Sequence, residues 1–309
     1  MFSTSFLILL ALIIIPILLA MLLVVVIFRR TRRGRRSPLS GNLLRSPGES
    51  LRIEIDQISE RANDFIFIVL LTCLPPLVVA SVLSSVQTNK VPEWQLILDF
   101  LFYLALLALV MRRLYQLLKL RANLYLGLDA ELAVGQELNH LMAFGCRVFH
   151  DFPAEKFNID HVVVGPAGVF AVETKGRTKP DKGRGSVDAT VVYDGQILRF
   201  PDWHEQEPLD QARRQADWLQ KWLSSAVGTT IPVRPALAIP GWFIERTKPG
   251  NVLIFNGKNP NFLARPQGLA GSMTTELQQR VAHQLEQRCR DVAPVAFQKK
   301  REGVSFGKR

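Results

Sequence analysis

Cysteine is scarce in this 309-residue chain, which contains only Cys73, Cys146 and Cys289. These residues are far apart, form no C-x-x-C pair and are odd in number, so we expect neither a disulfide framework nor a structural zinc site. The five histidines form no evident zinc cluster. The chain also lacks a phosphate-binding glycine loop followed by Lys and Ser or Thr, and the G-x-S-x-G elbow of serine hydrolases. The cysteine content fits a reducing compartment.

Acidic residues are outnumbered by basic ones. The chain has 27 Asp and Glu against 38 Lys and Arg, a formal net charge of +11. This excess favours an anionic partner, and both nucleic acid and anionic lipid headgroups fit it. Charge alone does not distinguish between the two.

Charges are absent from residues 6–28. About 20 apolar residues span the hydrocarbon core of a bilayer, so we predict a first transmembrane helix within residues 1–28. The basic run R-R-T-R-R-G-R-R follows it at 29–36, whereas in a signal peptide the basic residues come first. This order predicts an uncleaved anchor with its N-terminus outside and the arginines in the cytoplasm.

Two further apolar stretches, at 65–86 and 96–116, are predicted to be the second and third transmembrane helices, after a basic cytoplasmic connector at 29–64. The stretch at 65–86 is interrupted by Pro75-Pro76. Arginines follow the third stretch, so three crossings place the rest of the chain in the cytoplasm. We therefore expect a multi-pass protein of the inner (plasma) membrane. A helical hairpin that dips into the membrane is the alternative for these two stretches, and it leaves the C-terminal domain on the same side.

The stretch 158–175 reads N-I-D-H-V-V-V-G-P-A-G-V-F-A-V-E-T-K. Two β-branched runs flank a Gly-Pro-Ala-Gly turn, which predicts a β-hairpin. With the turn centred between Pro166 and Ala167, Asp160 faces Glu173 across the ladder. Side chains alternate along a strand, so Glu173 and Lys175 lie on the same face.

Two carboxylates beside a lysine suit metal-assisted hydrolysis. Carboxylate oxygens are ligands that Mg²⁺ prefers, and it needs only one or two of them besides water and substrate phosphate. The ion would polarise a phosphoryl oxygen, while the Lys175 ammonium would stabilise developing negative charge. In the alternative interpretation, Glu173 and Lys175 are a solvated pair at a strand end and Asp160 is a turn residue. Spacing alone leaves both open.

The hairpin resembles the core of the PD-(D/E)xK nuclease superfamily, and more narrowly its nuclease-related domain, NERD. The resemblance also covers G-Q-E at 135–137, E-P-L-D-Q-A-R-R-Q-A at 207–216 and P-A-L-A-I-P-G-W at 235–242. It implies an α/β fold, a restriction-endonuclease-like mixed β-sheet flanked by helices, preceded here by the transmembrane helices.

The same resemblance implies roles for individual residues. Asp160 and Glu173 would bind the metal with the Thr174 backbone carbonyl as a third ligand, and Lys175 would be the catalytic lysine. Two supporting residues complete the predicted site. Glu137, the acid of the first helix, would bind a second metal or water, and Gln211, the glutamine of the helix after the core strands, would orient substrate or support the site. For each, the alternative is a solvated side chain on a helix surface.

The nuclease-like domain is predicted over 121–290, followed by a basic tail at 291–309. Within it we expect a first helix at 121–144, strands at 187–193, 196–200, 233–239 and 252–255, and helices at 208–223 and 274–290. The basic loop 175–184 either contacts a phosphate backbone or is an ordinary solvated loop.

The function expected from these observations is a membrane-anchored, Mg²⁺-dependent nuclease, with Mn²⁺ as a substitute, that hydrolyses phosphodiester bonds of DNA and acts as an endonuclease. Its expected partners are DNA and membrane lipid; the sequence distinguishes neither DNA from RNA nor an endonuclease from an exonuclease. The alternative is a non-catalytic membrane-tethered protein that uses a nuclease-like fold for nucleic-acid binding, as a scaffold or as a sensor.

Overall fold

The computed structural model describes residues 38–85, 93–180, 182–183, 185–265 and 273–294, together with 19, 22–24, 26–27 and 30. Most of the predicted first transmembrane helix, all of the 29–36 arginine run except Arg30, and the tail from residue 295 on lie outside the described residues. The chain divides into two compact units. One comprises Met1–Leu43 with Asp291–Arg309, where Leu43 and Val292 form an isolated antiparallel bridge. The other, Leu44–Arg290, contains every element discussed below.

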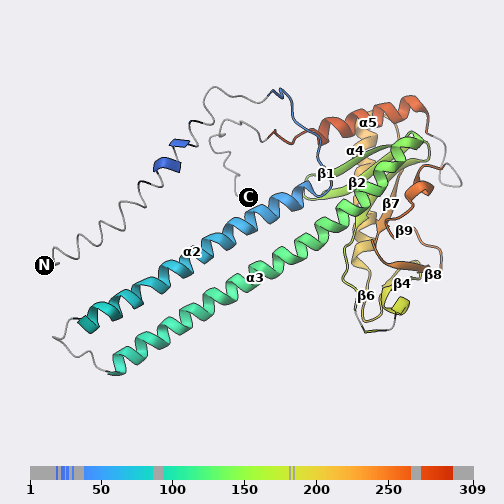
Figure 1. The fold of residues 1–309 in the computed structure, drawn as a ribbon. Helices are drawn as coiled ribbons and strands as arrows, with labels where there is room; N and C mark the ends of the chain where they lie inside the picture. Colours follow the sequence, from blue (N-terminus) through green and yellow to red (C-terminus); the bar gives the residue numbers. More distant parts are fainter. Residues whose placement is uncertain are drawn as a thin grey trace. The chain divides into compact units, whose positions relative to one another are not determined.

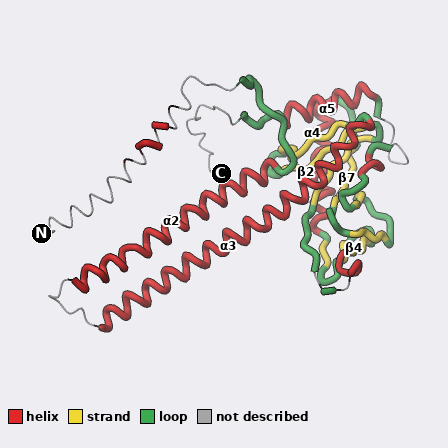
Figure 2. The backbone as a smooth tube through the Cα atoms, viewed as in Figure 1, coloured by secondary structure: helices red, strands yellow, loops and turns green. Residues whose placement is uncertain are grey.

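Two long helices begin the larger unit, α2 at Glu49–Ser85 and α3 at Glu93–Asn139, and they run side by side (Figure 1, Figure 2). The first turns of α2 bury Ile55, Ile58 and Ala62, whose spacing places them on one helix face. The helix continues through Pro75 and Pro76, where the sequence predicted an interruption. The predicted second and third spans therefore fall on α2 and α3.

One described helical stretch, Phe100–Phe144, is long and apolar enough to cross a membrane, and it covers most of α3. Its N-terminal part exposes apolar side chains that include Phe100, Phe102 and Leu109. Farther along α3, Leu128, Val134 and Leu138 are buried in the domain. The described residues thus provide one candidate span, where the sequence predicted three in the whole chain.

The central sheet has five strands in the order β1-β2-β3-β7-β9. Strands β1, β2 and β3 are antiparallel, whereas β3, β7 and β9 are parallel. In the β2–β3 hairpin, His161 pairs with Val172 and Gly165 with Gly168, which is the predicted register. The strands are β1 Arg147–Pro153, β2 Asn158–Gly165, β3 Gly168–Thr174, β7 Val233–Ala238 and β9 Leu253–Phe255.

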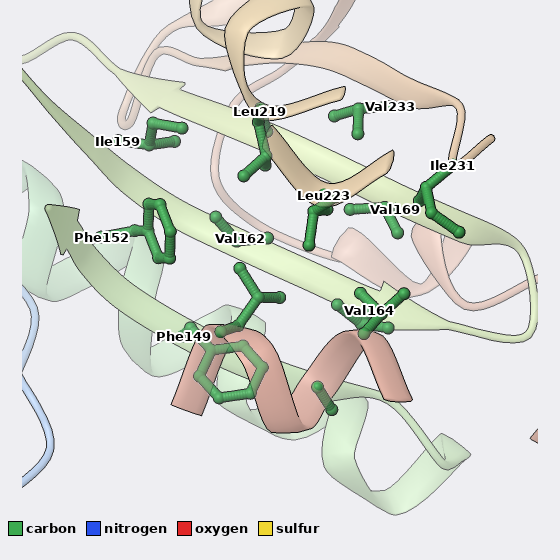
Figure 3. Close-up of a cluster of buried hydrophobic side chains, with 14 of the residues drawn as sticks. Phe149, Phe152, Ile159, Val162, Val164, Val169, Leu219, Leu223, Ile231 and Val233 are labelled. Atoms are coloured by element: carbon green, nitrogen blue, oxygen red, sulfur yellow. The ribbon is translucent and has the colours of Figure 1, made fainter. Parts of the chain in front are cut away.

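Helices cover both faces of this sheet. On one face, α4 (Glu207–Val227) and α5 (Thr275–Cys289) pack on the strands through residues such as Leu219, Leu223 and Val162 (Figure 3). The end of α3 and the 3₁₀ helix η1 (His140–Phe144) cover the other face. A further 3₁₀ helix, η3 (Pro260–Leu263), also contributes to that second core. Both faces are buried, as expected for strands rich in Val, Ile and Phe.

A second sheet has the order β6-β5-β4-β8. The predicted Asp194-Gly195 turn joins β4 and β5, which pair antiparallel. Strand β4 is shorter than the predicted 187–193, because the 3₁₀ helix η2 at Gly185–Ala189 precedes it. The strands are β4 Thr190–Tyr193, β5 Leu198–Arg199, β6 His204–Glu205 and β8 Phe243–Arg246. Together the two mixed sheets and their helices form an α/β fold.

Candidate active site

Asp160 and Glu173 lie at adjacent ends of β2 and β3. The backbone N–H of Thr174 donates a hydrogen bond to Asp160 Oδ2 at 2.6 Å, so the Asp160 carboxylate reaches across the hairpin to the residue after Glu173. The Glu173 side chain is almost completely buried. The hairpin therefore brings the two predicted carboxylates together.

Both oxygens of Glu173 accept hydrogen bonds. Lys175 Nζ donates to Oε1 at 2.5 Å, and Gln215 Nε2 donates to Oε2 at 2.6 Å. Gln215 Nε2 also donates to the Asn158 carbonyl at 3.2 Å. Lys175 keeps 23% of its side chain exposed, against 2% for Glu173. The ammonium group can thus meet a ligand from solvent while it holds a buried carboxylate.

The environment of Asp160 disfavours its negative charge. Burial is the main cause that raises the pKa of Asp160 well above its usual range, and the nearby charges of Glu173 and Glu131 raise it further. The Thr174 N–H and the Lys175 ammonium oppose this effect. Two carboxylates at one site repel each other unless a proton or a cation neutralises part of their charge.

Glu131, rather than the predicted Glu137, is the α3 acid beside the strand ends. Burial raises the pKa of Glu131 to about 8, and Asp151 and Glu173 add to the rise. Glu137 is partly exposed. Six residues along a helix rotate the side chain by about 240°, so the two glutamates occupy different faces of α3. The charge of Glu131 acts on Asp160, and that of Glu173 acts on Glu131.

Gln215, rather than the predicted Gln211, is the α4 glutamine that bonds to Glu173. The two glutamines are one turn apart and so share a face of α4. Gln215 is 2% exposed, whereas Gln211 is only partly buried. The predicted Gln211 therefore lies on the face of α4 that carries Gln215, and the docking of α4 determines which turn bonds to Glu173.

Thr174 participates through its N–H group. Its side chain lies on the sheet face opposite Glu173, as strand alternation requires, and Oγ1 is buried with no hydrogen-bond partner among the described residues. The predicted role of its carbonyl as a metal ligand stays a prediction.

A buried histidine pair lies on the strands next to the acids. His150 Nδ1 and His161 Nδ1 are 2.9 Å apart, and His150 Nε2 is 3.0 Å from Asn139 Oδ1. Burial lowers the pKa of His150 to about 4 and that of His161 well below its usual range. Both rings are thus neutral near pH 7, where they link β1 and β2 to the end of α3.

The oxygen donors at this site fit a hard divalent cation. Asp160 and Glu173 supply carboxylates, and Gln215 Oε1 is a buried oxygen acceptor without a donor among the described residues. In the part of the chain that the structure describes, no three His, Cys, Asp or Glu side chains form a metal site by themselves. Mg²⁺ is commonly held by only one or two carboxylates with water, so this donor set is compatible with it.

An α/β sheet that places two carboxylates and a lysine at neighbouring strand ends has the organisation of a nuclease-like fold. Residues 126–240 match the family model described as NERD, the nuclease-related domain. This match agrees with the resemblance carried by the hairpin and covers α4 and β7 as well. No curated protein and no solved structure was significantly similar to the chain.

The contact between Gln215 and Glu173 yields a first prediction. Gln215→Ala should lower the activity proposed below about 10-fold or more, because the variant removes a hydrogen bond to a buried carboxylate. Gln211→Ala should lower it much less. Initial rates of the two purified variants, compared at equal thermal stability, test this expectation. Equal losses of activity in the two variants would show that the hydrogen bond from Gln215 to Glu173 does not contribute to activity.

Proposed function

We propose that the protein is a membrane-anchored, Mg²⁺-dependent nuclease that hydrolyses phosphodiester bonds of DNA as an endonuclease. The observation that carries the proposal is the cluster of Asp160, Glu173 and Lys175 at adjacent strand ends, within a region that matches a nuclease-related domain. We further propose that the sheet belongs to the restriction-endonuclease type.

In this proposal Asp160 and Glu173 hold the cation, with the Thr174 carbonyl as a further ligand. When bound, a divalent cation polarises a phosphoryl oxygen and lowers the pKa of a bound water. The Lys175 ammonium stabilises negative charge that develops on the phosphate. Gln215 orients the Glu173 carboxylate through its hydrogen bond. Glu131 adds a third carboxyl group, which can take up or release a proton.

DNA as the substrate is supported by the net charge of +11 and by the basic loop after Lys175. In that loop, Arg177 forms a bidentate ion pair with Glu205 at 2.9 Å, and Lys182 pairs with Asp202 at 2.5 Å. Lys179 is exposed. We therefore assign Lys179 and Lys175 to phosphate contact and Arg177 to holding the loop on β6.

The experiment that tests the function uses the full-length protein in detergent micelles, with supercoiled and linear DNA and a matched RNA. Nicking of the circle with Mg²⁺ or Mn²⁺, its loss in EDTA and its loss in Lys175→Ala are the expected results. DNA binding without cleavage under every metal condition would instead support a tethered binding or scaffold protein. That alternative has its own support, because Lys175 and Gln215 already engage both oxygens of Glu173.

Membrane anchoring yields a second prediction. The exposed apolar side chains of α3 before Arg112 are unsuited to water, so we expect a multi-pass protein of the inner membrane with its nuclease-like domain in the cytoplasm. The full-length protein should stay in the membrane pellet after alkaline carbonate extraction. Cysteines introduced on the exposed surface of the domain, such as Glu245→Cys, should react with a membrane-impermeant maleimide only after the cells are broken. Release by carbonate would contradict the anchor, and labelling of intact cells would contradict the orientation.

A further inference from the structure

A short segment at the start of α2 lies against the candidate site, although it precedes the matched region 126–240. We call it the strap and define it as residues 45–50. Within it, Arg45 Nη1 donates to Asp151 Oδ2 at 2.7 Å. The N–H and the hydroxyl of Ser50 donate to the same oxygen at 2.9 and 2.6 Å. Asp151 is 3% exposed, so these donors come from the strap rather than from solvent.

Asp151 interrupts the ladder between β1 and β2 at the position opposite Asp160. His150 pairs with His161 and Phe152 with Ile159, but Asp151 and Asp160 between them do not pair. Asp151 has a φ of 47°, in the left-handed region that side chains other than glycine rarely adopt. Asp adopts this region more readily than most residues, and its contacts determine whether it stays there. The three hydrogen bonds from the strap are such contacts.

A second route leads from the strap to Glu173. The Asn158 amide group donates to Ser50 Oγ, and the Asn158 carbonyl accepts from Gln215 Nε2 at 3.2 Å. Gln215 Nε2 in turn donates to Glu173 Oε2. One serine hydroxyl therefore connects with both strands that carry the predicted metal ligands.

Glycines let the strap approach α3 closely. A Cβ added to Gly135 would lie 2.7 Å from Pro47 Cγ, a distance that real Cβ contacts do not show. Gly48 has a φ of 68°, and its Cβ would meet the Leu128 side chain. The Gly48 N–H also bonds to the Glu131 carboxylate. Gly135, which begins the G-Q-E motif, is thus explained by contact with the strap.

We propose that the strap is a positioning element of the candidate site, in which Arg45 and Ser50 hold Asp151 and Asn158 so that Asp160 and Glu173 keep their places. The strap also couples α2 to the site, because Ser50 lies in the first turn of α2. A displacement of α2 would change the site without any contact between α2 and substrate. The inference rests on the proposed function for the roles of Asp160 and Glu173, but not for the contacts themselves.

The test measures backbone hydrogen exchange by mass spectrometry on the full-length protein in detergent micelles. Peptides that cover 168–177 report on the Thr174 N–H, which bonds to Asp160. Ser50→Ala and Arg45→Gln should each accelerate exchange there, and together they should accelerate it about tenfold. Gly135→Ala, which displaces Pro47 without altering a polar group, should act in the same direction.

Matched controls are available on α2. Ser59→Ala removes a hydroxyl that bonds to the Ile55 carbonyl of the same helix, and Arg61→Gln removes an exposed cation; neither should change exchange in 168–177. Asp151→Asn should rescue the slow exchange that Asp151→Ala loses, since Asn keeps an oxygen acceptor and tolerates the left-handed region. Unchanged exchange in the strap variants, equal acceleration in α4 peptides 219–227, or identical behaviour of the Asn and Ala variants would overturn the proposal.

A parallel cleavage assay separates the two proposals. Strap variants should need more Mn²⁺ for half-maximal cleavage, because their metal ligands are less well positioned. An inactive wild type with local acceleration in the variants would overturn the nuclease function and leave the positioning role standing. An active wild type whose strap variants keep normal exchange and metal dependence would overturn the strap.

Discussion

Glu173→Gln is expected to abolish metal-dependent DNA cleavage, with a loss of about 10³-fold or more. The substitution keeps the size of the side chain and one oxygen acceptor, so one of the two hydrogen bonds from Lys175 and Gln215 stays possible, while an amide NH2 replaces the other oxygen. It removes the negative charge that would hold the cation. The loss should therefore arise from chemistry and metal affinity rather than from the fold.

The measurement is the rate of nicking of supercoiled DNA across a Mg²⁺ and Mn²⁺ series, beside a thermal melt of each variant. Glu245→Gln is the matched control, because Glu245 is an exposed glutamate on β8, in the second sheet. Full activity in a folded Glu173→Gln protein would remove Glu173 from the proposed mechanism.

Glu131→Gln is expected to stabilise the metal-free protein, increasingly so as the pH rises. The pKa of Glu131 is raised from 4.5 to about 8, so the folded protein holds this proton over a pH range in which the unfolded chain has lost it. The free energy of unfolding therefore falls as the pH rises from about 4.5 to about 8. Each pKa unit corresponds to about 1.4 kcal/mol, which gives an upper limit on the order of 5 kcal/mol.

Thermal melts in EDTA at pH 5, 7 and 9, followed by tryptophan fluorescence, test this expectation. The difference in Tm between Glu131→Gln and the wild type should be small at pH 5 and largest at pH 9. Glu137→Gln, on a different face of the same helix, should show no such trend. A Glu131→Gln variant that is less stable than the wild type at pH 9 would show that the ionised Glu131 carboxylate does not destabilise the folded protein.

The central hairpin was predictable because its determinants are local. The β-branched runs and the Gly-Pro-Ala-Gly turn specify the register, and the structure pairs His161 with Val172 as expected. Strand alternation then places Glu173 and Lys175 on one face, where they form an ion pair. The helix near 208–223 and the strand near 233–239 were also found, since amphipathic periodicity and apolar runs mark them.

The helix residues that lie at the site were harder to predict from the sequence. Gln211 and Gln215 lie on one face of α4. Which of them reaches Glu173 depends on the position at which α4 docks along the sheet. Glu131 and Glu137 lie on different faces of α3. The rotation of α3 about its axis determines which of them lies near Asp160. Periodicity determines which side chains share a face, but the depth and rotation of a packed helix depend on interdigitation with residues distant in the chain.

What the sequence alone determined about this protein is therefore its hairpin, the convergence of Asp160, Glu173 and Lys175, and the nuclease-related region that the family match supports. Only the tertiary structure decided that Gln215 bonds to Glu173, that the charge of Glu131 acts on Asp160 and that the strap bonds to Asp151. The physical reason is the range of the interactions. A turn and a strand period act over a few residues, whereas the bond from Ser50 to Asp151 joins positions 101 residues apart and exists only once α2, α3 and the sheet have packed.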